Sequence, residues 1–245
     1  MKKLFLIPFV ILPISGLSQT PTAAEILVKI DENTVAGSRT AITTMIVHGR
    51  RSDRTMKSIS WIEGVEKSFS EYLEPAREKG TKMLKLKDQL WMYSPQSDRI
   101  IRIAGHMLRL SMMGSDFSYE DMLEDRSLFD TYKAEILGSE IFGERKCWVL
   151  KLTAIVDDAA YNSRKIWVDK ERYLPLREDR FAKSGKLLKT AEILEVFQVN
   201  QRWYPKRMLF KDALSKGKGT ELIIESIEFD ADIPDHIFTK AGLRK

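Results

Sequence analysis

Hydrophobic and polar residues alternate with a period of two along most of the chain beyond residue 38. That period is typical of β-strands, whose successive side chains point to opposite faces of a sheet. It is visible in "TAITTMIV", "TMKSISWIEG", "KMLKL", "CWVLKLTAI" and "SRKIWVD". "KMLKLKDQLWMY" predicts a hairpin that turns at residues 87–89, and "KSGK" and "SKGKG" have the composition of further hairpin turns. We therefore expect about ten strands in one antiparallel sheet.

Two segments depart from this alternation. Thr22 and Glu25 have the spacing of a capping box, and Ile26, Leu27 and Ile30 form one apolar stripe, so we expect an amphipathic helix over residues 22–34. Residues 105–128 lack alternation, which predicts helix or loop there. Near the C-terminus, Pro234 has the position of a residue that opens a short helix.

The lysines in the alternating segments indicate which face of the sheet is solvated. Lys85, Lys87, Lys151 and Lys165 would lie on an outer face. The predicted inner face then carries Leu84, Leu86, Trp148, Leu150, Leu152, Ile166 and Val168. An apolar sheet face must be covered, and the N-terminal helix and the irregular segment are the available covers. The predicted fold class is therefore mainly β (α+β): a strongly curved, half-open antiparallel β-barrel with an N-terminal helix, a helical or loop lid insertion and room for a ligand cavity.

The N-terminus indicates export. "MKK" is followed by the apolar run "LFLIPFVILPIS" and by small residues at Gly16 and Ser18, the pattern of a cleaved signal peptide over residues 1–18. No cysteine lies near the cleavage point to carry a lipid anchor, so we expect a periplasmic protein with one domain over residues 19–245. Removal of Lys2 and Lys3 lowers the net charge from +5 to +3, and no basic block suggests a nucleic-acid partner.

Catalytic and metal-binding motifs are missing from the sequence. The three histidines are widely separated, and the single cysteine, Cys147, sits in a predicted strand. No nucleophile elbow, phosphate loop or dinucleotide fingerprint is present. Four acids at Asp116, Glu120, Asp121 and Asp125 lack the pattern of a calcium loop, and we interpret them as a solvated helix face or as charges favoured by the dipole at a helix N-terminus. We expect no enzyme activity, no metal and no cofactor.

The stretch "SMMGSDFSYEDM", residues 111–122, is both acidic and apolar. Methionine is unbranched and adapts to irregular or changing packing partners. The stretch is therefore either a movable lid over an apolar pocket or a fixed plug of the inner face. The lid hypothesis predicts lipid-binding side chains in the cavity and lid at Leu84, Leu86, Trp91, Met107, Met112, Met113, Phe117, Met122, Trp148, Leu150 and Ile166.

Several segments resemble the outer membrane lipoprotein-sorting proteins, the LolA-like proteins of the bacterial envelope. They are "KMLKLKDQLWMYSPQSDRIIRI", "LRLSMMGSDFSYEDM", "WVDKERYLPLREDRFAKSGKLLKTAEI", "WYPKRMLFKD" and "TELIIESIEFDADIPDHIFT". The resemblance extends from about Ala24 to the C-terminus. It implies a half-open barrel with an apolar cavity for acyl chains, and a periplasmic carrier that takes lipoproteins from an inner-membrane transporter to an outer-membrane acceptor. It also implies an arginine that pins the lid, which the sequence matches to no single residue.

Two other functions fit the same fold. Proteins of this branch are often linked to transporters of the resistance-nodulation-division type, so the cargo of a carrier could be a lipid other than a lipoprotein. The alternative to a carrier is an interaction module that transports nothing, such as an envelope-stress sensor or an accessory subunit of an inner-membrane transporter.

Overall fold

The computed structural model describes residues 20–34, 37–124 and 126–244 of the chain. The signal peptide predicted for residues 1–18 lies outside the described residues. Within these described ranges, every helix is too short or too polar to cross a membrane.

The described residues form one antiparallel sheet of thirteen strands that does not close into a barrel. The predicted fold class is confirmed, with three strands more than the ten expected. The strands are β1 (Ser38–Val47), β2 (Arg54–Glu63), β3 (Lys67–Glu74), β4 (Lys82–Leu86), β5 (Gln89–Ser94), β6 (Arg99–Ile103), β7 (Tyr132–Phe142), β8 (Arg145–Ala154), β9 (Ser163–Asp169), β10 (Pro175–Phe181), β11 (Leu187–Val199), β12 (Arg202–Asp212) and β13 (Thr220–Phe229).

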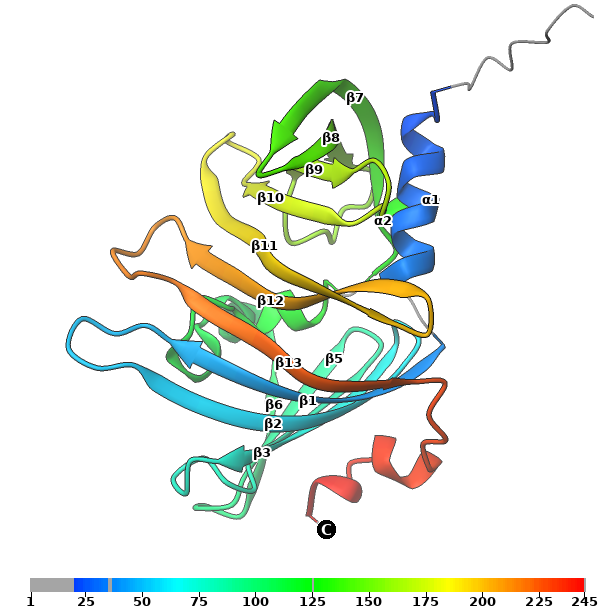
Figure 1. Ribbon diagram of the computed structural model, residues 1–245. Helices are drawn as coiled ribbons and strands as arrows, with labels where there is room; N and C mark the ends of the chain where they lie inside the picture. Colours follow the sequence, from blue (N-terminus) through cyan, green and yellow to red (C-terminus); the bar gives the residue numbers. More distant parts are fainter. Residues whose placement is uncertain (1–19, 35–36, 125, 245) are drawn as a thin grey trace, which may run out of the picture.

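The strand order brings the two halves of the chain together in the middle of the sheet. Strands β1 to β6 run as a meander toward one edge, strands β13 to β7 run toward the other, and β1 pairs with β13. The edge strands β6 and β7 are therefore consecutive in sequence. The chain that joins them contains three short 3-10 helices, η1 (Gly105–Arg109), η2 (Met112–Gly114) and η3 (Tyr119–Met122), and the helix α2 (Leu128–Thr131). We call residues 104–124 the insertion; Figure 1 shows the sheet curving around it.

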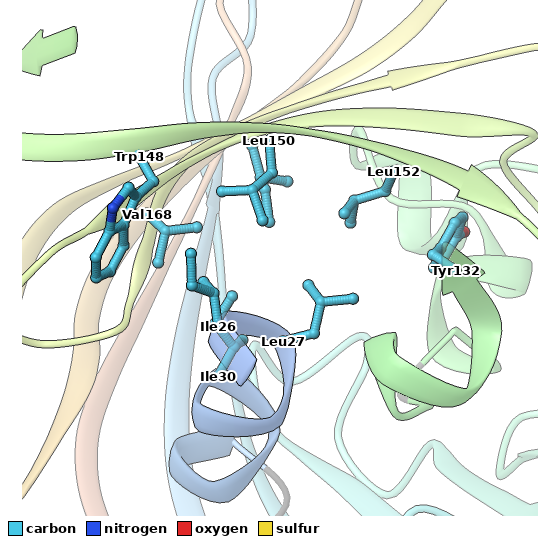
Figure 2. Packing of buried hydrophobic residues seen from close by; sticks show 9 residues of the cluster. Ile26, Leu27, Ile30, Tyr132, Trp148, Leu150, Leu152 and Val168 are labelled. Carbon is cyan, nitrogen blue, oxygen red and sulfur yellow. The ribbon is translucent and has the colours of Figure 1, made fainter. Parts of the chain in front are cut away.

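The N-terminal helix α1 (Ala23–Thr34) forms where the capping box predicted it. Glu25 accepts a hydrogen bond from the backbone N–H of Thr22 at 2.7 Å, and the backbone N–H of Glu25 donates to the Thr22 hydroxyl at 3.2 Å. Ile26, Leu27 and Ile30 are at most 1% exposed. They pack against Trp148, Leu150, Leu152, Ile166 and Val168 of β8 and β9, as Figure 2 shows for most of these side chains.

Burial of an aliphatic side chain of this size contributes about 1.5–3 kcal/mol. The apolar stripe of α1 therefore holds the helix against the β7–β9 end of the sheet. Five of the residues predicted for the inner face lie there as predicted: Trp148, Leu150, Leu152, Ile166 and Val168.

The other two inner-face residues were assigned wrongly. Directly paired residues share a face, and the pairing places Leu84 with Trp91, and Leu86 with Gln89, on the face opposite to Met83 and Leu90. On this outer face Leu84, Leu86 and Trp91 pack against Phe238 and Leu243 of the C-terminal 3-10 helices η4 (Asp235–Phe238) and η5 (Gly242–Arg244).

The physical reason is that β4 is covered on both faces. Met83 and Leu84 are both almost completely buried, and Lys85, which the sequence suggested for the outer face, is 3% exposed on the inner one. Alternation identifies the two faces of such a strand but not which of them is solvated. The short helix predicted after Pro234 is confirmed as η4, and it provides the outer cover.

Candidate functional site

The interface between the insertion and the inner face of β1–β6 contains eight of the ten methionines of the chain. Met45, Met56, Met83 and Met92 come from the strands, and Met107, Met112, Met113 and Met122 come from the insertion. We call this group, with the apolar residues around it, the methionine cluster; its other members are Val47, Tyr72, Leu90, Ile103, Leu108, Phe117, Tyr119, Leu123 and Leu222. The insertion thus meets the sheet through unbranched, deformable side chains from both sides.

Local hydrogen bonds shape the insertion. The backbone N–H of Met112 donates to the carbonyl of Phe117 at 2.8 Å, and Ser111 bridges Ser118, so the stretch doubles back on itself. Met113 and Gly114 turn the chain with φ values of 51° and 68°. After the turn, the Asp121 carboxylate accepts from the Ser118 backbone N–H at 2.7 Å and caps η3. This compact loop presents its methionines to the sheet.

Arg54, at the start of β2, holds the turn of the insertion from one side. Its Nη2 donates to the carbonyl oxygens of Met113 at 3.0 Å and of Gly114 at 3.1 Å. On another side, the Asp116 carboxylate accepts from the Thr220 hydroxyl at 2.6 Å and from the backbone N–H of Asp212 at 2.9 Å. The insertion is therefore tied to β2 and to the ends of β12 and β13.

The third attachment is an ion network on the inner face of β9–β11. We define the network as Arg164, Glu178, Arg180 and Lys189 from the strands with Asp121 and Glu124 from the insertion. Arg180 pairs with Asp121 at 3.1 Å and with Glu178 at 3.0 Å, and Arg164 pairs with Glu178 at 2.8 Å. Arg164 also contacts Glu124, and Lys189 contacts Asp121. All six side chains are at least 85% buried.

The network contains three cations and three anions, so its charges balance while the insertion is seated. Burial alone would raise the pKa of the Glu178 carboxyl, but Arg180 and Arg164 outweigh burial and lower that pKa to about 2. Burial opposes ionisation of Asp121 as well, and Arg180 and Lys189 hold its pKa below the ordinary value. Both carboxylates are ionised at neutral pH, and each depends on its cationic partners.

The structure brings together most of the residues predicted for the cavity and lid, in two separate groups. Met107, Met112, Met113, Phe117 and Met122 lie in the methionine cluster, where the ring of Phe117 also packs on Phe210 of β12 with the ring centroids 4.2 Å apart. Trp148, Leu150 and Ile166 lie on the inner face under α1. Leu84, Leu86 and Trp91 belong to neither group, because they face outward under the C-terminal segment.

The sequence interpretation missed the charged residues of the inner face. Asp116 and Asp121 were taken for solvated acids, but both are bound to the sheet, and Asp125 lies outside the described residues. A signal for Arg164 was present, since the alternation that placed Ile166 and Val168 inside also places Arg164 inside. A charge on a predicted inner face requires a partner. Within the described part of the chain, no group of three His, Cys, Asp or Glu side chains is arranged to hold a metal ion.

Gly114 offers a test of the Arg54 attachment. A Cβ at residue 114 would lie 2.7 Å from Nη2 of Arg54, whereas a Cβ at Gly105 would meet nothing within 4 Å, and both glycines have positive φ. Gly114→Ala should therefore raise amide exchange across residues 105–124 roughly tenfold above that of Gly105→Ala, because it also disrupts the Arg54 hydrogen bonds. Hydrogen-exchange mass spectrometry measures this, and equal exchange in the two variants would contradict the role of Arg54.

The ion network predicts an acid-dependent loss of stability. The folded-state pKa of Glu178 and of Asp121 is lower than the unfolded values of 4.5 and 3.8, so their contribution is present above about pH 4.5 and is lost as pH falls toward 2. Asp121→Asn should lower the free energy of unfolding by about 3 kcal/mol at pH 7, because it leaves Lys189 without an anionic partner and Arg180 with Glu178 alone.

Urea unfolding between pH 7 and pH 2.5 checks this, since the difference between Asp121→Asn and the unmodified protein should shrink below about pH 4. The control is Asp157→Asn, which removes an exposed acid and should leave the unfolding curve unchanged. Wild-type and Asp121→Asn curves that stay parallel down to pH 2.5 would show that Asp121 contributes no linked protonation.

Three known structures with the same fold bear on the family of this chain. A domain from Vibrio parahaemolyticus, assigned to the outer membrane lipoprotein-sorting proteins, superposes with a TM-score of 0.80 at 25% sequence identity and covers 91% of this chain and 98% of its own. A LolA superfamily protein from Nitrosomonas europaea gives a TM-score of 0.76 at 26% identity, over 91% of this chain and all of its own. A DUF1329 family protein from Desulfovibrio piger shares the fold, with a TM-score of 0.83 at 21% identity over 90% of this chain and 97% of its own.

Comparison with curated proteins gives no match. A family model with the description "-like: Uncharacterized protein" matches residues 64–245, which include β3 to β13, the insertion and the whole ion network. The chain therefore belongs to this family, and its fold is that of the LolA-like outer membrane lipoprotein-sorting proteins.

Proposed function

We propose that the protein is a periplasmic carrier that binds the acyl chains of lipoproteins or of another lipid on the inner face of its sheet, with the insertion as a lid. The observation that carries this proposal is the methionine cluster, in which four methionines of the insertion pack on four methionines of the sheet. A lid that leaves and returns needs an interface that packs acceptably with two different partners, and thioether side chains have that property.

The energetics suit a carrier that must release its cargo. Each buried methylene contributes about 0.8 kcal/mol, so one long acyl chain contributes on the order of 10 kcal/mol before ordering costs. In the structure the insertion occupies the same apolar surface with its own methionines and with Phe117. A returning lid would restore that burial, and it would offset part of the gain from the acyl chain. Binding and release are then close in free energy and require no nucleotide.

The three attachments of the insertion support movement as a unit. Arg54, Asp116 and the ion network all act on residues 113–124, and the loop is held together by its own hydrogen bonds. Arg54, which donates to the backbone carbonyls of the turn, is our candidate for the lid-pinning arginine implied by the resemblance. Polar attachments of this kind can exchange with water when the loop lifts, whereas a fixed apolar plug needs none of them.

The cellular setting of the proposal follows from the sequence and from the names of the structural relatives. The predicted signal peptide would deliver the chain to the periplasm, and the Vibrio parahaemolyticus relative is named for outer membrane lipoprotein sorting. An inner-membrane transporter as donor and an outer-membrane acceptor would complete the route. The alternative, a non-transporting sensor or transporter subunit on this fold, predicts an insertion that never leaves the sheet.

The test is mass spectrometry of organic extracts from protein purified under native conditions from a periplasmic fraction. The unmodified protein should carry an acylated species at a stoichiometry near one. Replacement of both Met112 and Met113 by Asp should abolish it, because two carboxylates cannot be buried on an apolar surface without partners.

The matched control is Leu110→Asp, which adds a charge to the same insertion at a side chain that is 51% exposed and outside the methionine cluster. It should retain the bound species. An unmodified protein that is empty and also takes up no added lipid would contradict the carrier and favour the interaction module.

A further inference from the structure

The charge balance under the insertion exists only while the insertion is seated. Asp121 and Glu124 supply two of the three anions of the ion network, and both belong to the insertion. When the lid lifts, Arg164, Arg180 and Lys189 keep Glu178 as their only anionic partner within the network. Asp212, opposite Lys189 on β12, accepts a hydrogen bond from the backbone N–H of Leu214 at the following turn. The open inner face would therefore carry a net positive site beside its apolar surface.

Each arginine of this site has one N–H donor without a hydrogen-bond partner among the described residues even while the insertion is seated. Nε of Arg164 and Nε of Arg180 are buried without a hydrogen-bond partner in the part of the chain that the structure describes. The Arg164 side chain is only 5% exposed. The hydroxyl of Tyr161 donates to Asp121, so it would also be released when Asp121 leaves. Two guanidinium groups, an ammonium and a phenol match an anion with several acceptor oxygens, such as a phosphate.

A cavity borders this site next to Lys189. A cavity of about 230 Å³ lies between the insertion and the β11–β12 pair, and Lys189, Tyr161 and Ser118 line it. With the insertion seated, Asp116, Glu120 and Asp212 also line the cavity, with Arg109 as a second cation, so three acids against two bases disfavour an anion there. Lifting the insertion removes Asp116, Glu120 and Arg109 from this lining and leaves Lys189, which is paired with Arg180 on β10 and with Asp212 on β12. A bound anion and the seated insertion would therefore exclude each other.

From these contacts we infer that the cargo has an anionic, phosphate-bearing headgroup, which binds Arg164, Arg180 and Lys189 in place of Asp121 and Glu124. The inference rests on the proposed carrier function and adds the class of its ligand. Acyl chains replace the methionines of the lid, and the phosphate replaces the two carboxylates of the lid. The insertion thus has the same two chemical parts as the proposed cargo, one apolar and one anionic. A neutral lipid would leave the three cations with Glu178 as their only anionic partner within the network, which is strongly unfavourable for buried charges.

The test measures extraction of fluorescent lipids from phosphatidylcholine vesicles by the full-length mature protein. Phosphatidic acid and diacylglycerol with the same acyl chains and the same label are compared, so that only the phosphate differs. The protein should take up phosphatidic acid at least about tenfold more tightly, as expected for charge-assisted hydrogen bonds. Lys189→Gln, at the cavity, should reduce this preference severalfold. Lys151→Gln, which removes an exposed charge from the opposite face of β8, should leave it unchanged.

Asp121→Asn provides a second variant that acts in the other direction. Because it removes a competing carboxylate of the lid, it should take up phosphatidic acid more tightly than the unmodified protein, provided that its circular dichroism spectrum is native. Equal uptake of the two lipids would overturn the headgroup inference and leave the carrier function standing. Uptake of neither lipid would overturn both. Competition by inorganic phosphate or glycerol phosphate as effective as that by phosphatidic acid would assign the site to free phosphate and overturn its role in lipid binding.

Discussion

The buried ion network between the insertion and strands β9–β11 is the interaction that fixes the insertion on the sheet. An open sheet of thirteen strands has an inner face that it cannot bury against itself, so the chain must supply a cover. Apolar contact alone would let the cover slide, since hydrophobic attraction has no preferred direction. Asp121 and Glu124 fix the position of the insertion on the sheet, because each forms an ion pair with one particular arginine. Charges buried at this depth stabilise the fold only when every partner is present.

The topology explains why the insertion lies where it does. The edge strands β6 and β7 are neighbours in sequence, so the chain that joins them must cross the open side of the sheet. The other covers arise differently. Helix α1 packs with aliphatic side chains on the β7–β9 end, and the C-terminal segment packs with Phe238 and Leu243 on the outer face of β3–β5. Both use rigid apolar contacts typical of permanent packing. Of the three covers, the insertion combines methionines with buried ion pairs, which is why we assign the movable role to it.

Much of the fold was predictable from the sequence, and the reasons differ from element to element. The helix at residues 23–34 was predictable from a capping box and an apolar stripe, both of which are local sequence patterns. The faces of β8 and β9 were correctly assigned because Lys151 and Lys165 mark the solvated side. At β4 the same rule failed, since Phe238 and Leu243, more than 150 residues away in sequence, cover the face that Leu84 occupies. The alternation of residues within a strand does not reveal which distant segment covers each of its faces.

The four methionines of the insertion and Phe117 were predictable as a group, because their composition is unusual in a β-rich chain, whereas the four methionines of the sheet were not predicted. Their charged partners were not, since Arg164, Arg180 and Lys189 lie 40 or more residues from Asp121, a separation that carries no spacing signal. Tertiary contact alone brings them together.

Movement of the insertion on lipid binding is the central claim of this account, and a distance measurement tests it directly. Spin labels at Leu110 of the insertion and Leu137 of β7, both about half exposed, would report the position of the lid relative to the sheet by double electron–electron resonance. Cys147 is completely buried and is replaced by serine in the labelled protein. The account predicts one narrow distance distribution without lipid and a shifted, broader one when lipid is bound. An unchanged distribution in protein that mass spectrometry shows to be loaded with lipid would contradict the lid.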